Sequence, residues 1–203
     1  MRLPRSALAL ALMLPACTHP DAPPAAKTGA AAPGMTAAPG SAATSVYAFS
    51  AVPFQGTEPK SLKAYEGQVL LIANIAANCG FTPQMGPLGE LETKYKDRRF
   101  HVLGFLSDDF GQQGGTVSEV KACSLQYHAS FDEFAHIHVK KGPEQHPLFA
   151  FLTSRPGKEE DVSWNFNKWI IDRKGQVVAR YPSEVSPEAP ELIAVLEREL
   201  AAP

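Results

Sequence analysis

The chain has 203 residues, a formal net charge of −2 at pH 7 and 44 % hydrophobic residues. Its acidic and basic residues are interspersed, with no basic run and no aromatic residues among basic ones, which argues against a nucleic-acid-binding surface. No internal repeat is visible, which argues against a solenoid. Only three cysteines occur, too few for a scaffold built on disulfides.

Residues 1–16 have the features of a signal peptide for export. Two arginines lie within the first five residues, and the apolar run from Ala7 to Leu14 is too short to span a bilayer. Cys17 follows a small residue, which resembles the bacterial lipoprotein signal, in which such a cysteine is lipidated and becomes the mature N-terminus. Pro15 departs from that pattern, so an ordinary cleaved signal followed by an incidental cysteine is the alternative. Both interpretations predict export, and the first predicts a periplasm-facing protein anchored by lipid to a bacterial membrane.

Residues 17–45 are rich in Ala, Pro, Gly and Thr and have almost no large apolar side chain. Such a segment cannot bury enough surface to order itself, so we expect a flexible tether that reaches roughly 30 Å. Residues 46–203, about 160 in number, suit a single domain with its own hydrophobic core. The two cysteines of that domain, Cys79 and Cys123, suggest one structural disulfide or one redox pair.

The first half of the domain predicts strands separated by a helix. We expect a hairpin or short edge strand over Val46–Phe54, a buried strand over Val69–Ile75, a helix over Pro83–Lys96 and a strand over His101–Leu106. Thr82 is a good N-cap for the helix, and Pro83 suits its first position.

The second half predicts helices and a hairpin. We expect a helix over 116–127, with a capping box between Thr116 and Glu119, and then an extended segment over 131–139. His146 and Pro147 open a second helix. A hairpin of strands 166–172 and 176–181 follows, and an amphipathic helix over 187–200 ends the domain. Strands that alternate with helices imply an α/β fold with a central mixed sheet and helices on both faces. This order of elements matches a thioredoxin-like fold.

Cys79 is the residue around which the predicted elements are arranged. It lies on a tight turn between the carboxyl end of a buried strand and the N-terminus of a helix, where open α/β sheets place their chemistry. Free backbone N–H groups and the helix dipole favour an anion there, which for a cysteine is the reactive thiolate. The alternative is a buried and inert cysteine, since free cysteines are commonly buried.

Four stretches of the domain resemble the glutathione peroxidase family in its cysteine form. They are ANCGFTPQ around Cys79, VLGFLSDDFGQQ over Val102–Gln113, HPLFAFL over His146–Leu152 and WNFNKWIIDRKGQVVARY over Trp164–Tyr181. The resemblance covers nearly the whole domain, from about Phe49 to Leu200. It implies an enzyme of oxidative-stress defence that reduces hydrogen peroxide or organic hydroperoxides with thiols and no cofactor.

The resemblance also implies roles for particular residues. Cys79 matches the peroxidatic cysteine, and Trp164 and Asn165 match two residues that lie close to the reactive sulfur. Their indole N–H and amide are donors that stabilise a thiolate. Cys123 matches the resolving cysteine of relatives that use thioredoxin, which lies on a mobile helix far from the first sulfur. The alternatives are core packing for Trp164 and a half-buried structural cysteine for Cys123.

Asp109 departs from the family pattern, because the family has a glutamine there that donates to the sulfur. An ionised carboxylate cannot donate and would oppose a nearby thiolate. Asp109 is therefore protonated, points away or pairs with a cation, and Gln112 or Gln113 could supply the donor instead. We expect Asp109→Gln to speed peroxide reduction, because it removes a like charge near the sulfur and restores a donor.

Partners and oligomeric state follow from the same resemblance. The segment between Lys141 and Trp164 lacks the insertion of tetrameric, glutathione-using relatives, which predicts a monomer with either a thioredoxin-like protein or glutathione as reductant. His136 and His138 would share one face of a strand, but no third ligand has a supporting spacing, so we expect no metal site.

Two other functions compete with the peroxidase. One is a thiol–disulfide oxidoreductase of the same fold, which would place a second cysteine where Phe81 and Thr82 stand. The other is a non-catalytic binding module in which Asp109 has eroded the site.

Overall fold

The structure is a computed structural model that describes residues 43–114, 116–155 and 160–203. The expected signal (1–16), Cys17 and nearly all of the expected tether (17–45) lie outside these residues. No helix in the described ranges is long and apolar enough to cross a membrane.

The described chain contains strands, α-helices and short 3-10 helices in alternation. The strands are β1 (Ser50–Ala51), β2 (Lys60–Ser61), β3 (Val69–Ile75), β4 (Phe100–Leu106), β5 (Asp132–Phe134), β6 (Lys168–Ile171) and β7 (Val177–Tyr181). The α-helices are α1 (Met85–Tyr95), α2 (Val117–Gln126), α3 (Pro147–Thr153) and α4 (Pro190–Ala201). The 3-10 helices are η1 (Val46–Ala48), η2 (Leu62–Tyr65), η3 (Thr82–Gln84) and η4 (Lys96–Arg98).

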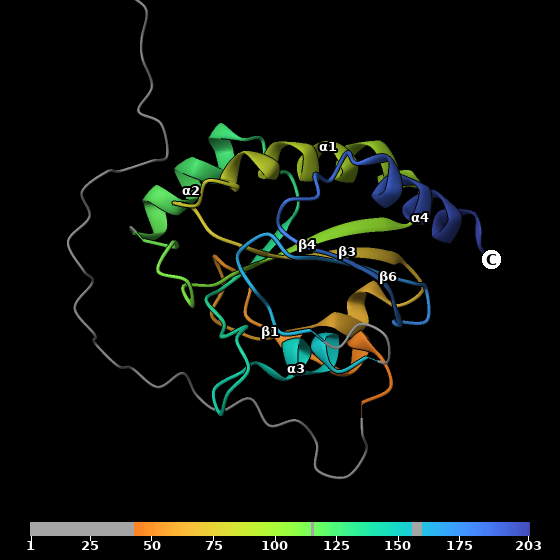
Figure 1. Ribbon diagram of the computed structural model, residues 1–203, viewed down its shortest axis with the longest axis horizontal. Coiled ribbons are helices and arrows are strands. Elements are labelled where there is room, and N and C mark those ends of the chain that lie inside the picture. The colour runs from red at the N-terminus through yellow and green to blue at the C-terminus, as the bar shows by residue number, and fades with distance from the viewer. Residues whose placement is uncertain (1–42, 115, 156–159) are drawn as a thin grey trace, which may run out of the picture.

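The central sheet is mixed and has the strand order β5-β4-β3-β6-β7. β3, β4 and β5 are parallel, whereas β6 is antiparallel to β3 and β7 is antiparallel to β6. Helices α1, α2 and α4 lie on one face of this sheet, and α3 lies on the other, together with β1 (Figure 1). The predicted α/β architecture with helices on both faces is confirmed.

β3 is buried along its whole length and separates two hydrophobic cores. Val69 and Leu71 belong to the core under α1 and α4, while Leu70 and Ile72 belong to the core that α3 covers. An apolar run without polar alternation suits a strand that is covered on both faces. Asn74 is the one polar residue of this strand, and its side chain is used at the candidate site.

Several predicted boundaries are confirmed and others are wrong. The bounds of the strand over Val69–Ile75 are correct, and Thr116 and Glu119 form the predicted capping box of α2. Thr82 is not an N-cap, because its side chain accepts the N–H of Cys79, which precedes it, and the helix begins as η3 before α1.

Elements in the second half of the domain are shorter than predicted. Only Asp132–Phe134 of the expected segment 131–139 pairs with β4. The strand expected from Phe166 begins at Lys168, because Phe166 has a left-handed backbone with φ of 64°. The last helix begins at Pro190, after a turn in which the Ala189 N–H donates to the Ser186 carbonyl. At the N-terminal end, β1 and β2 form the predicted hairpin as a separate two-stranded sheet.

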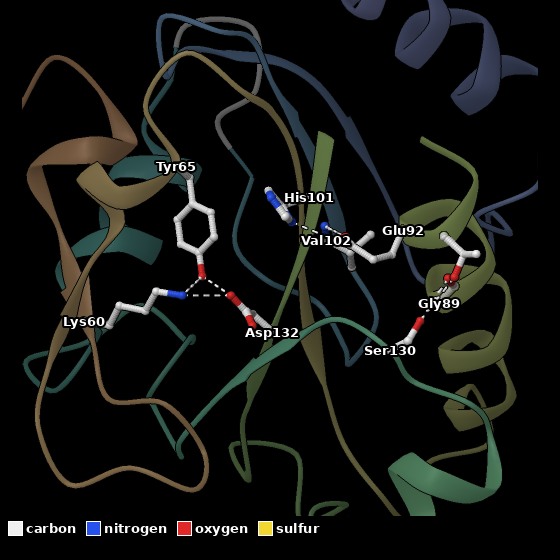
Figure 2. A network of polar contacts seen from close by, with 9 residues as sticks. Lys60, Tyr65, Gly89, Glu92, His101, Val102, Ser130 and Asp132 are labelled. Atoms are coloured by element: carbon white, nitrogen blue, oxygen red, sulfur yellow. Dashed lines mark hydrogen bonds and ion pairs between the residues drawn. The ribbon is translucent and has the colours of Figure 1, made fainter. Parts of the chain in front are cut away.

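A polar cluster joins this hairpin to the edge of the central sheet. Lys60 Nζ lies 2.9 Å from Asp132 Oδ2 and 2.6 Å from the Tyr65 hydroxyl, which itself donates to Asp132 (Figure 2). Burial and the neighbouring Asp132 carboxylate raise the pKa of Tyr65 well above its usual value. The phenol therefore remains a donor throughout the ordinary pH range and links η2 to β5.

A second polar contact joins α1 to β4. Glu92 is mostly buried, and its carboxylate accepts the Val102 N–H at 2.6 Å and contacts His101 Nδ1 at 2.9 Å (Figure 2). A buried carboxylate that receives two hydrogen bonds is satisfied, so it fixes where the helix crosses the strand.

Candidate active site

Cys79 lies on the predicted turn, directly after β3 and before η3. Its side chain is buried, with an exposed fraction of 2 %, and the Phe81 N–H points at Sγ from 3.5 Å. The turn is closed by Thr82, whose hydroxyl accepts the Cys79 N–H at 3.0 Å and donates to the Ala76 carbonyl at 2.9 Å. The sulfur therefore lies in the turn before η3, with a backbone donor aimed at it.

The segment with Trp164 and Asn165 is fixed to β3 by Asn74. The Asn74 amide donates to the Trp164 carbonyl at 3.0 Å, and its oxygen accepts the Asn167 N–H at 3.0 Å. The Phe166 N–H donates to the Asn74 carbonyl at 2.6 Å, which holds the left-handed residue in place. One asparagine in an apolar strand thus positions the whole turn.

Trp164 and Asn165 have different environments. Trp164 is 39 % exposed and its ring packs on Phe110 with centroids 5.1 Å apart, so core packing is not its role. Asn165 is fully buried, and within the described part of the chain neither atom of its amide has a hydrogen-bond partner. An unsatisfied buried amide costs about 1–3 kcal/mol, so its retention suggests a functional use.

The loop after β4 lies against the Cys79 turn. The Asn78 N–H, next to Cys79, donates to the Gln112 carbonyl at 2.8 Å. Gln113 is 1 % exposed, and among the described residues its side-chain amide, like that of Asn165, has no hydrogen-bond partner. This loop therefore brings a buried amide to the neighbourhood of the site, although Asp109 occupies the position of the family's glutamine.

Asp109 itself is bound to the segment 138–140. One oxygen lies 2.8 Å from His138 Nδ1, and the other accepts the N–H groups of Val139 and Lys140. Burial alone would raise the pKa of Asp109, but these hydrogen bonds and the adjacent histidine lower it below its usual value. Both oxygens attach one loop to another, which fits the alternatives in which Asp109 points away from the sulfur or pairs with a cation.

Cys123 lies on α2, in the same hydrophobic core as Cys79. Its Sγ is 3.5 Å from the Ala77 carbonyl, two residues before Cys79, so α2 packs directly on the turn that carries Cys79. No disulfide joins the two cysteines. The contact seen is with the Ala77 carbonyl, and the expectation that Cys123 lies too far from the Cys79 sulfur to bond without movement of its helix stays a prediction.

Lys168 was missed from the sequence. It opens β6 fully buried, and its Nζ donates to Gln84 Oε1 at 2.8 Å and to the Phe166 carbonyl at 2.6 Å. The available signal was a lysine placed before the apolar run Trp169–Ile171, where a charge is costly. It joins the helix after Cys79 to the segment after Asn165.

The histidines do not form a metal site in the described ranges, where no group of three or more His, Cys, Asp or Glu side chains could hold an ion. His136 and His138 lie beyond the end of β5, so they do not share a strand face as expected. His138 Nδ1 lies 2.8 Å from Asp109 Oδ1, so this ring is bound to the Asp109 carboxylate.

The comparisons with known proteins agree with this geometry. Residues 46–153 match the glutathione peroxidase family. The chain is 42 % identical over 163 residues to a protein of Synechocystis sp. named hydroperoxy fatty acid reductase gpx1, a match that covers 75 % of this chain and 94 % of that protein. Among solved structures it is similar to Trgpx in its apo form, with a TM-score of 0.63 and 29 % identity over 79 % of this chain and 99 % of that one.

A thiol:disulfide interchange protein of the thioredoxin family from Chlorobium tepidum is similar in fold alone. Its TM-score is 0.53 at 17 % identity, over 75 % of this chain and 93 % of that one. The predicted thioredoxin-like fold is thereby confirmed. The family match spans more than half of the chain, and the chain covers almost all of the Synechocystis relative. This protein is therefore a peroxidase that belongs to the glutathione peroxidase family.

Proposed function

We propose that the protein is a thiol peroxidase in which Cys79 is the peroxidatic cysteine. The observation that carries the proposal is the buried Cys79 sulfur in the turn between β3 and η3, with the Phe81 N–H directed at it. The thiolate attacks one peroxide oxygen, the O–O bond breaks, and the other oxygen takes a proton and leaves as water or an alcohol. Sulfur becomes a sulfenic acid. The amide of Asn165 and the indole N–H of Trp164 would be the donors to the sulfur, as the resemblance to the family implies.

The second half of the cycle would use Cys123. Its thiol attacks the sulfenic sulfur, the S–S bond forms and water leaves. A thioredoxin-like dithiol, or two molecules of glutathione, then returns two electrons and two protons. The contact of Cys123, on α2, with the Ala77 carbonyl near Cys79 supports this order of events.

The substrate class is hydrogen peroxide and organic hydroperoxides. A relative at 42 % identity is named for the reduction of hydroperoxy fatty acids, which supports a lipid hydroperoxide as one substrate of this chain. We place the activity in oxidative-stress defence at a membrane surface.

The test is peroxide consumption by Cys79→Ser and Cys123→Ser beside the wild type, with a thioredoxin system or glutathione as reductant. Cys79→Ser is expected to fall to the rate without enzyme, because no other thiol occupies the turn. Cys123→Ser should still consume one equivalent of peroxide and then stall. Equal consumption by Cys79→Ser would contradict the proposal, and insulin reduction by the wild type would favour a thiol–disulfide oxidoreductase.

The cellular location is proposed from the first 45 residues. Export, lipidation of Cys17 and a tether over 17–45 would hold a monomeric domain clear of a bacterial membrane on its periplasmic side. Mass spectrometry of the mature protein should find Cys17 as an acylated N-terminus. A triacylated cysteine anchors stably, whereas one acyl chain alone is marginal. An unmodified N-terminus at another residue would contradict the anchor.

A further inference from the structure

Lys168 is a buried cation without a carboxylate partner. Its side chain has no exposed surface, and its Nζ contacts three oxygens: Gln84 Oε1 at 2.8 Å and the carbonyls of Phe166 at 2.6 Å and Ser183 at 3.5 Å. None of the ion pairs within the described ranges involves it. Burial lowers the pKa of Lys168 to about 7, although Glu184 acts in the opposite direction.

Two of the three oxygens belong to the segments that build the site, and the third, from Ser183 after β7, lies between them. Gln84 ends η3, which begins three residues after Cys79. The Phe166 carbonyl follows Asn165 directly along the chain. Ser183 joins both segments, because its carbonyl accepts from Gln84 Nε2 at 2.7 Å and its hydroxyl donates to the Asn165 carbonyl at 2.6 Å.

The number of donors on Lys168 changes with its protonation. An ammonium has three N–H donors, which match the three oxygens around it. A neutral amine has two donors and a lone pair, so one oxygen loses its hydrogen bond and faces a lone pair instead. Loss of the proton would therefore loosen the connection between the η3 segment and the Phe166 carbonyl, which follows Asn165.

We propose that Lys168 is a positioning residue whose ammonium form holds the Cys79 helix start and the Trp164–Asn165 turn in their reactive arrangement. This inference rests on the proposed function of Cys79 and adds a regulation to it. Reactivity at the sulfur then depends on the charge of a residue that does not touch the substrate, and it is enhanced only while Lys168 is protonated.

Other groups around Lys168 affect its titration. Three of them carry or can gain a charge. Glu184 follows β7, and Tyr181 is the β7 partner of Lys168 on β6. The third is Arg180, whose guanidinium donates to Asn167. β3 and η3 face Lys168 with Ala73 and Gln84, which do not titrate. Variants of Lys168 and Gln84 therefore address its protonation most directly.

The experiment compares Lys168→Met with the wild type in the full chain from pH 5.5 to 9. The rate of Cys79 alkylation by iodoacetamide and the rate of reaction with hydrogen peroxide are both measured. We expect Lys168→Met to be slower by at least about fivefold at pH 6, as one lost charge-assisted hydrogen bond implies. The ratio of the two rates should approach one as pH rises through about 7, because the wild-type lysine is then neutral as well. Lys174→Met, at an exposed lysine of the β6–β7 hairpin, is the matched control and should leave the ratio at one.

Gln84→Glu is the second variant, and it keeps Lys168. Its carboxylate would replace the amide oxygen 2.8 Å from Nζ and raise the pKa of the lysine, so the transition should move to higher pH. The ¹³C resonance of the Lys168 ε-carbon, assigned in the wild type through its bonded neighbours, reports the titration without reference to Lys168→Met.

Two results would overturn the inference. One is a Lys168 ε-carbon that titrates only above about pH 9, as an ordinary lysine does. The other is a folded Lys168→Met whose alkylation rates follow the wild type at every pH. Alkylation needs no peroxide, so a lysine-dependent alkylation in a protein that fails to reduce peroxide would contradict the proposed function and leave this inference intact.

Discussion

Asp109 stands where the family pattern has a glutamine, and its carboxylate makes contacts that a glutamine amide would not make. A glutamine at this position would offer an amide to the sulfur, whereas the carboxylate accepts hydrogen bonds from the backbone of Val139 and Lys140 and contacts His138. The buried amide in this loop belongs to Gln113 instead. Asp109 therefore attaches this loop to residues 138–140, while the Gln112 carbonyl holds it to the Cys79 turn.

Asp109→Asn is expected to lower the free energy of unfolding by about 1–3 kcal/mol at pH 7, because an amide has one acceptor oxygen for three donors. Peroxide reduction should slow as well, and Asp109→Gln should slow it rather than speed it. The folded-state pKa of Asp109 is lowered, so its stabilisation is present at neutral pH and disappears as pH falls below about 4. Denaturant unfolding at pH 7 and pH 3 measures this, and Asp97→Asn, at an exposed aspartate of η4, is the control. A faster Asp109→Gln enzyme would show that the carboxylate acts on the sulfur.

Helix α2 is the element that connects the second cysteine to the site. Its N-terminus is capped by Thr116 and Glu119, and Cys123 on its buried face contacts the Ala77 carbonyl. The opposite face exposes Val117 and Leu125, so only part of the helix is packed. A helix with few buried residues opens at a lower free energy than the rest of the core.

One equivalent of hydrogen peroxide is expected to produce a disulfide between Cys79 and Cys123 within one chain. The bond needs Cα atoms within about 7 Å, and α2 already lies on the turn that carries Cys79. Peptide mapping without reductant, together with hydrogen exchange of the α2 amides, follows the bond and the opening of the helix. Cys123→Ser should accumulate sulfenic acid at Cys79 instead. If the wild type does the same, Cys123 is a structural residue.

At the scale of the whole molecule, polar contacts join the N-terminal hairpin to the central sheet. The hairpin lies outside the five-stranded sheet, and the Lys60–Tyr65–Asp132 cluster links it to edge strand β5 (Figure 2). The attachment of the N-terminal hairpin therefore depends on contacts between residues that are 67 and 72 positions apart.

Tyr65→Phe is expected to lower the free energy of unfolding by about 1–2 kcal/mol, since it leaves the mostly buried end of the ring without its hydroxyl bond to Asp132. Asp132→Asn and the double variant complete a thermodynamic cycle by denaturant unfolding. A coupling energy of at least about 0.5 kcal/mol indicates a direct interaction. Additive effects would show that the two side chains stabilise the fold independently.

The sequence by itself determined the elements whose stability is local. The apolar run Val69–Ile75, the capping box of Thr116 and Glu119 and the hairpin turn after Asp172 were all predicted, because each depends on residues a few positions apart. The position of Cys79 between strand and helix followed from the same local signals.

Only the tertiary structure decided which polar side chains meet. The direction of the Asp109 carboxylate, the contact of Cys123 with Ala77 and the burial of Lys168 each depend on segments that are 31 to 84 residues apart. Periodicity and capping patterns describe which face of an element is apolar, but they carry no information on which loops pack together. Burial, which removes water from Lys168 and from the amides of Asn165 and Gln113, is set by that packing, and with it the chemistry these groups can perform.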